Sequence, residues 1–379
     1  MSKRKKNNNN RKKGPIVFLS VILVIVALFA SFVLIKYNKM KKDAINVTED
    51  TFVYDFDDET EPEKLEDDIE FDTIFEETAD GFKNSVKEWA TNGGDIMYSN
   101  DVINVLCVGV DTRNKSTISG LSDSMIIVSI NKKLGTITLT SVMRDCYSYL
   151  ESPDGVGSFN KINSAFPFYG VDNLIDTIQN HFKIRIDGYA MINFNFFKAV
   201  INKFDGVTVP VQQYEADYLN KTYKDFNISA GKSVTLNGDE ALAFCRSRKC
   251  DSDGDVSRTR RQRQVMIALL SEAAKIETTE IDDYITLFLP YVKTSYSESE
   301  LLSLGTKAVV GGWAKFTVNQ LVMPDEASRY GHSGSIWYWA VDYPLASQTL
   351  QKTIYGESNI VLKEDRVTSI DLLLGRGEN

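Results

Sequence analysis

Residues 102–142, VINVLCVGVDTRNKSTISGLSDSMIIVSINKKLGTITLTSV, decide the fold. The run 102–110 is almost entirely apolar, which is typical of a strand buried on both faces of a sheet. Residues 124–130 and 136–142 are rich in β-formers, and the polar stretch 131–135 between them, ending in glycine, indicates a hairpin turn. The sequence therefore predicts three consecutive strands.

Strands and helices alternate through the remainder of the chain. Apolar periodicity predicts helices over 172–182, 196–204, 237–245 and 257–276, and further strands over 189–194, 315–322 and 336–341. This alternation predicts an α/β fold, a layered α-β-α domain with a central mixed sheet, over about residues 100–356. Residues 357–379 are expected to be a tail.

A membrane segment precedes this domain. Residues 16–35, IVFLSVILVIVALFASFVLI, contain no charge, and a helix of that length spans about 30 Å. The run is too long for a cleaved signal peptide. Seven Lys/Arg precede it and four follow closely, so the positive-inside bias places residues 1–14 in the cytoplasm. We expect a signal anchor over 15–36 and an extracytoplasmic domain; a nucleic-acid-binding role for the basic tail is disfavoured.

The linking region and the overall composition narrow the possibilities. Residues 44–80 are strongly acidic, so 37–99 is expected to be an extended stalk, although aromatic residues such as Phe52 and Phe71 leave open that part of it docks on the domain. Only two histidines are present, which argues against multi-histidine zinc sites. Four cysteines without a CxxC spacing exclude a zinc ribbon.

Charged residues recur where the first three strands begin or end. Asp111 and Arg113 follow the first strand, Asp123 stands at the start of the second, and Arg144 and Asp145 follow the third. Each taken alone is typical of a turn or a surface ion pair. Their recurrence indicates a ligand site, because open α/β sheets bind ligands at strand ends.

A further group of arginines lies at the start of the helix predicted over 257–276. When its apolar stripe is followed backward from Val265, Arg258 and Arg261 continue it, whereas Arg260 and Arg263 fall off it. Inward arginines need anions, and the helix dipole disfavours cations in the first turns. A bound phosphate would satisfy them; pairing with Asp255 or with the strand-end carboxylates is the alternative.

These groups together describe a phosphoryl-transfer site. Carboxylates that hold a divalent cation opposite several arginines are the usual components of such a site. Asp111 and Asp123 are the predicted ligands of Mg²⁺. ATP is not a routine donor outside the cell, so a lipid-linked pyrophosphate is the expected phosphate donor beside a membrane anchor.

Seven motifs in fixed order carry a family resemblance. They are NVLCVGVDTR (104–113), LSDSMIIVSIN (121–131), TLTSVMRD (138–145), KINSAF (161–166), FDGVTV (204–209), LNGDEALAFCRSR (236–248) and GDVSRTRRQRQV (254–265). Their order resembles the LytR-CpsA-Psr family of bacterial cell-envelope proteins. The resemblance implies an Mg²⁺-dependent phosphotransferase that moves an anionic glycopolymer, of the teichoic acid or capsular polysaccharide type, from a polyprenyl-pyrophosphate carrier. The implied acceptor is the C6 hydroxyl of muramic acid in peptidoglycan.

The same resemblance assigns roles to individual residues. It implies that Asp111 and Asp123 hold the metal, and that the pyrophosphate is faced by Arg113, Arg144, Arg246, Arg248, Arg258 and Arg261, with Gln262 beside them. Lys161 and Asn163 match a further motif that we assign to substrate binding. Leu121 stands where the family often has arginine, which bears on donor preference. The general base stays open between Asp145, Asp255 and a metal carboxylate.

Alternative functions and the cysteines complete the expectations. A polyprenyl-pyrophosphate hydrolase, transfer to a protein acceptor, or a non-catalytic membrane-anchored regulator or glycan-binding module remain alternatives. Cys245 and Cys250 flank RSRK, where a disulfide would close a small loop. Cys107 is expected in the core, and no cysteine is expected to be catalytic.

Overall fold

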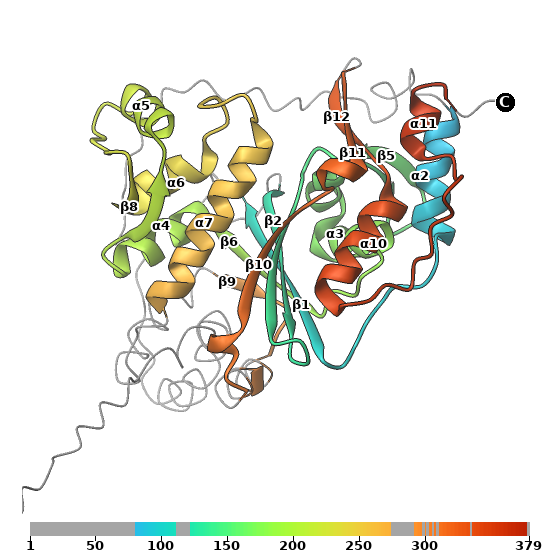
Figure 1. The fold of residues 1–379 in the computed structure, drawn as a ribbon, viewed down its shortest axis with the longest axis horizontal. Helices are drawn as coiled ribbons and strands as arrows, with labels where there is room; N and C mark the ends of the chain where they lie inside the picture. The colour runs from blue at the N-terminus through green and yellow to red at the C-terminus, as the bar shows by residue number, and fades with distance from the viewer. Residues whose placement is uncertain are drawn as a thin grey trace, which may run out of the picture.

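The computed structural model describes residues 80–110, 122–273, 292–297, 300, 303–304, 307, 311–333 and 336–376 (Figure 1). The predicted tail 1–14, the anchor 15–36 and the stalk up to residue 79 lie outside these residues. Among the helices of the described ranges, none combines the length and the apolar character needed to cross a membrane.

A six-stranded mixed sheet forms the centre of the domain, in the order β10-β3-β2-β1-β6-β9. Its strands are β1 (Val102–Val110), β2 (Ser122–Asn131), β3 (Thr136–Val142), β6 (Gly188–Asn193), β9 (Val292–Thr294) and β10 (Thr317–Met323). Strands β1, β2 and β3 are antiparallel neighbours, whereas β6 runs parallel to β1 and β10 parallel to β3. The predicted mixed sheet is confirmed, and β1 and β3 have the predicted bounds.

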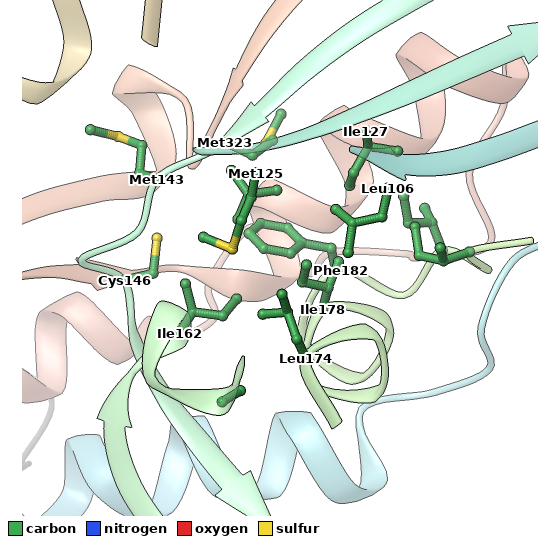
Figure 2. Packing of buried hydrophobic residues seen from close by; sticks show 14 of the residues in the cluster. Leu106, Met125, Ile127, Met143, Cys146, Ile162, Leu174, Ile178, Phe182 and Met323 are labelled. Atoms are coloured by element: carbon green, nitrogen blue, oxygen red, sulfur yellow. The ribbon is translucent and has the colours of Figure 1, made fainter. Parts of the chain in front are cut away.

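Helices cover both faces of this sheet. The larger core lies on the face covered by α3 (Ala165–Phe182) and α10 (Tyr343–Tyr355), where Leu106, Ile127 and Phe182 are buried together (Figure 2). The opposite face carries α7 (Asp255–Ala273), and Ile126 and Leu139 form a smaller cluster there with side chains of α7. The predicted α-β-α layering is therefore observed.

A second lobe packs beside α7. It contains α4 (Phe194–Lys203), α5 (Gln213–Thr222), α6 (Gly238–Arg246) and the hairpin of β7 (Val207–Val211) and β8 (Gly231–Leu236). These elements share their own apolar core, to which α7 contributes Val265. Helix α6 begins where the sequence predicts it, because the Asn237 side chain accepts hydrogen bonds from the N–H groups of Asp239 and Glu240, and Glu240 reaches back to the N–H of Asn237.

The two ends of the predicted domain differ from expectation. Within the predicted stalk, residues 80–92 form helix α2 (Asp80–Asn92), and its Phe82, Val86 and Ala90 are buried. Within the predicted tail, α11 (Ser369–Leu373) packs on α2, as Figure 1 shows, and Arg366 forms an ion pair with Asp342. Both segments belong to the folded domain because their apolar residues complete its main core.

Two further hairpins lie near the end of β3. One is formed by β4 (Tyr147–Glu151) and β5 (Gly157–Lys161), and the other by β11 (Arg329–Ser333) and β12 (Trp337–Val341). Residue 146 forms a bridge with Trp339 of β12, so the segment after β3 is held against the second hairpin.

Candidate active site

The topology brings three of the charged segments to one edge of the sheet. Val110 pairs with Ser122, and Ile126 pairs with Ser141. The end of β1, the start of β2 and the end of β3 therefore share this edge. Asp111, Arg113 and Leu121 lie outside the described residues, as does the side chain of Asp123, so the structure positions only the chain segments that flank the predicted metal ligands.

A buried carboxylate, Asp145, follows β3 and binds two cations. Lys161 Nζ, at the end of β5, lies 2.9 Å from its Oδ1, and Arg144 Nε lies 3.4 Å from its Oδ2. Burial alone would raise the pKa of Asp145, but Arg144, Lys161 and Arg258 more than offset it, and the pKa lies below its usual value. Asp145 is consequently ionised at neutral pH.

A second carboxylate, Asp255, gathers three guanidinium groups. It is the first residue of α7, and its Oδ1 lies 2.6 Å from Arg258 Nη2. Arg144 Nε and Arg248 Nε each lie 3.9 Å from the same oxygen. These arginines come from the segment after β3, from the loop after α6 and from the first turn of α7. We call Arg144, Lys161, Arg248 and Arg258, with Asp145 and Asp255, the cation cluster.

Arg261 has a different environment from the one expected. Its side chain is fully buried, and Nη1 donates to Glu215 Oε1 (3.1 Å) and to Asp251 Oδ2 (2.9 Å), while Nη2 donates to the carbonyl of Ser247. Arg261, predicted to face a pyrophosphate, thus pairs internally with Glu215 and Asp251, which are not the internal partners that the sequence analysis considered. Arg261 thus fixes the loop between α6 and α7, which carries Arg248.

Arg260 and Arg263 were both predicted to lie off the buried face of the helix. The prediction is confirmed for Arg260 and is wrong for Arg263. Arg260 is partly exposed and pairs with Glu215 (2.9 Å). Arg263, expected off the buried stripe, is only 8% exposed and donates to Ser141 Oγ of β3 (2.8 Å). Burial, aided by Arg260, lowers the pKa of Arg263 to about 10. The error arises because α7 is covered on two sides, by the sheet and by the second lobe.

The remaining predicted residues surround the cluster. Gln262 Oε1 accepts from Ser124 Oγ of β2 (3.1 Å). Asn163 is buried, and its N–H donates to the carbonyl of Arg144 (3.3 Å). Arg246 ends α6 with its guanidinium 4.8 Å from the centroid of the Phe194 ring. Gln262 and Asn163 therefore tie neighbouring elements to the site edge, and Arg246 lies against an aromatic ring of the second lobe.

The cysteines are thiols. All four are free, so the disulfide that the sequence left open between Cys245 and Cys250 is not formed. Cys146 lies in the main core, while Cys107 is partly buried against the smaller cluster. Burial raises the pKa of Cys107 and of Cys245 to about 12, which keeps both protonated.

Sequence reasoning missed the partners of Arg261. Glu215 lies 46 positions before it and Asp251 10 positions before it. The sequence around Glu215 indicates only a capping box, in which Glu215 is the third residue of α5; it does not indicate an ion pair with Arg261. Within the described ranges, no group of three or more His, Cys, Asp and Glu side chains is arranged to hold a metal ion.

The fold and the site together define an α/β domain in which arginines and a lysine gather around two carboxylates at one sheet edge. The chain belongs to the LytR-CpsA-Psr family, because the LytR_cpsA_psr family model matches residues 71–354. The resemblance drawn from the sequence is confirmed.

Individual relatives agree with this assignment. A Bacillus licheniformis protein named polyisoprenyl-teichoic acid–peptidoglycan teichoic acid transferase TagU is 33% identical over 208 residues, which cover 54% of this chain and 63% of that protein. The match thus spans less than two thirds of that relative.

Two solved structures share the fold. A Streptococcus agalactiae protein matches with a TM-score of 0.62 and 22% identity, over 74% of this chain and 96% of its own. A LytR-CPS2A-psr family protein, TagT, with bound octaprenyl pyrophosphate lipid matches with a TM-score of 0.52 and 21% identity, over 68% and 93%.

Proposed function

We propose that this protein is a membrane-anchored phosphotransferase that moves an anionic glycopolymer from a polyprenyl-pyrophosphate carrier to the C6 hydroxyl of muramic acid in peptidoglycan. The observation that carries the proposal is the cation cluster, in which four cationic side chains share two carboxylates at one sheet edge. Family membership and the name of the TagU relative support the same donor and acceptor.

The cluster is suited to hold a pyrophosphate. Its excess positive charge is concentrated where Arg144, Arg248 and Arg258 approach one oxygen of Asp255. Within the cation cluster, four cationic side chains face two carboxylates, and the excess of positive charge favours an incoming polyanion. Arginine forks match phosphate oxygens and stabilise the charge that develops during transfer.

The proposed reaction is an in-line displacement at the phosphorus that carries the glycopolymer. The C6 oxygen forms a bond to phosphorus, and the bond to the bridging oxygen breaks, so that polyprenyl phosphate leaves. The proton of the attacking hydroxyl passes to a carboxylate. Asp145 is a poor acceptor because its pKa is lowered. We favour Asp255, whose Oδ2 is buried and has no hydrogen-bond partner among the described residues.

Mg²⁺ belongs to the proposal through Asp111 and Asp123. Carboxylate oxygens are ligands that Mg²⁺ prefers. Val110 and Ser122, the residues directly before Asp111 and Asp123, pair with each other at this edge of the sheet. The ion, when bound, would neutralise charge on the phosphate oxygens. The anchor over 15–36 would hold the domain outside the cell membrane, where lipid-linked donor and peptidoglycan meet.

The test is a transfer assay with the purified full chain in detergent. It is incubated with Mg²⁺, a polyprenyl-pyrophosphate-linked sugar and a peptidoglycan oligomer, and mass spectrometry follows polyprenyl phosphate and the phosphodiester adduct. We expect an adduct that is lost with EDTA and in the Asp255→Asn and Asp111→Asn variants. Arg260→Met, outside the cation cluster, is the matched control and should retain activity.

The other outcomes assign the alternatives. Release of polyprenyl phosphate without adduct would replace the transferase by a hydrolase. Binding of the donor without release of either product would identify a binding module.

A further inference from the structure

The hairpin of β11 and β12 presents two different faces. In β12, Tyr338 and Ala340 point inward and are buried, and Tyr338 lies against Phe82 and Tyr147 in the main core. Trp337 and Trp339 alternate with them on the other face of the strand, where Trp339 is partly buried against the edge of the main core and Trp337 is the exposed ring. The Trp337 side chain is 39% exposed, so a large apolar ring is left in water on a strand that otherwise serves the core.

The outward face forms an aromatic platform. The rings of Trp337 and Trp339 meet edge to face, with centroids 4.7 Å apart. Gly331, opposite Trp339 in the hairpin, lies beside both rings: a Cβ there would be in ordinary van der Waals contact with them, 3.4 Å from the Trp339 ring and 3.6 Å from the Trp337 ring. Both rings therefore lie over the backbone at Gly331.

A cation borders this platform. The guanidinium of Arg329 lies 5.0 Å from the centroid of the Trp339 ring. Its Nη1 donates to the carbonyl of Pro324 (3.1 Å) and contacts Met143 Sδ (3.8 Å). Within the described ranges, Arg329 forms no ion pair with a carboxylate, so its charge is available to an anionic group on a ligand.

The platform is continuous with the cation cluster. The backbone N–H of Trp339 donates to the carbonyl of Asp145 (2.9 Å), the residue after Arg144. Arg329 contacts Met143, the residue before Arg144. In Figure 1 the hairpin projects beyond the body of the domain, beside α11. A ligand that lies on the platform is therefore next to the segment Met143–Asp145, which carries two members of the cation cluster.

We propose that the outer face of this hairpin, formed by Trp337, Trp339, Gly331 and Arg329, binds the acceptor glycan strand of the transfer reaction. Flat indole rings stack on the apolar faces of pyranose sugars, while a neighbouring guanidinium binds hydroxyl or carboxylate oxygens. A peptidoglycan strand offers both, since its amino sugars have apolar faces and its peptide stems carry carboxylates. This inference rests on the proposed function and adds the surface that the acceptor uses.

The occupant is the acceptor rather than the polymer of the donor. A polyphosphate polymer is recognised by several cations, and the platform offers one cation beside two rings. The backbone contact to Asp145 also places the platform on the carboxylate side of the cluster. Arg144 bridges Asp145 and Asp255, the carboxylate proposed to take the proton of the acceptor hydroxyl, so the acceptor sugar is expected on this side.

Binding is tested with the full chain in detergent and a β-1,4-linked N-acetylglucosamine tetramer, measured by calorimetry. We expect wild type to bind, and Trp337→Ala to bind about tenfold more weakly, the loss of roughly one stacked ring. Tyr330→Ala is the matched control, because Tyr330 is an exposed aromatic residue of the same hairpin that pairs with Ala340 on the opposite face. Trp337→Phe should restore most of the affinity.

Equal affinity of Trp337→Ala and wild type would overturn the inference. So would absent binding of the tetramer to wild type, or preferential binding of a free glycerol-phosphate polymer at this face. Melting temperatures separate loss of the platform from loss of the fold. We expect those of all variants to stay close to that of wild type, because Trp337 and Tyr330 are both exposed.

The transfer assay separates this inference from the proposed function. In Trp337→Ala we expect the KM for the peptidoglycan oligomer to rise about tenfold, with donor binding unchanged. If wild type makes no adduct yet Trp337→Ala loses tetramer binding, the proposed function fails and the platform stands. If adduct forms equally well in both, at all acceptor concentrations, the platform fails and the function stands.

Discussion

Replacing Glu215 by glutamine tests how the buried Arg261 is held in place. Glu215 Oε1 lies 3.1 Å from Arg261 Nη1, and both side chains are almost completely removed from water. At an effective dielectric constant near 20, one such contact corresponds to about 5 kcal/mol of gross attraction. Asp251, at 2.9 Å, remains in the variant, and glutamine keeps one hydrogen-bond acceptor. A loss of about 3 kcal/mol in unfolding free energy is therefore expected.

Thermal unfolding of the full chain in detergent measures this loss. A change of about 3 kcal/mol should lower the melting temperature by roughly 6–10 °C. Glu240→Gln is the matched control, because Glu240 has the same capping-box position in α6 as Glu215 has in α5 and no ion pair among the described residues. A decrease no larger than that of the control would refute the view that the Glu215 charge compensates Arg261.

Three further predictions concern pH, catalysis and backbone conformation. Burial lowers the pKa of His181 from 6.5 to about 4, so the free energy of unfolding should fall by roughly 3 kcal/mol as pH falls from about 6.5 to 4. Denaturant unfolding at pH 6.5 and pH 4 measures this loss, and an equal loss in His181→Gln would contradict the assignment to His181. Arg144→Met should slow donor cleavage about 100-fold in the transfer assay, whereas a rate like that of Arg260→Met would remove Arg144 from the site. Gly206→Ala should destabilise the protein by more than about 2 kcal/mol, because Gly206 has φ +107° and a Cβ would lie 2.6 Å from Thr235. Gly375→Ala, with φ +67° and open space around a Cβ, should cost about 1 kcal/mol. Equal melting temperatures of the two variants would contradict the predicted difference.

Local signals predicted the elements that local forces determine. Strand β1 has the predicted bounds because it is an almost continuous apolar run, and β3 because its β-forming residues follow a turn that ends in glycine. Helix α6 begins at its Asn237 cap. Helix α2 was missed because acidic residues before it dominated the composition, although Phe82, Val86 and Ala90 recur every four positions. That spacing is the signal that composition concealed.

The sequence named four residues that the structure brings together, but it did not predict how all of the neighbouring arginines are arranged. The motifs named Arg144, Lys161, Arg248 and Arg258, and topology brings these four together. A one-face periodicity argument could not place Arg263, since α7 is buried on two sides. The partners of Arg261 depend on contacts between distant chain segments, for which a single sequence carries no local signal.

The hydrogen bond from Trp339 to Asp145 makes a late strand of the chain a component of the candidate site. The side chains of the cation cluster are spread from residue 144 to residue 258, and the strand that holds Asp145 follows about eighty positions later. Contacts between such distant segments form late in folding, because closing long loops is entropically costly. Asp145 therefore acquires this backbone partner only when β12 has docked. Under the proposed function, a chain truncated before β12 would lack the hydrogen bond that holds Asp145 and would bind the donor more weakly.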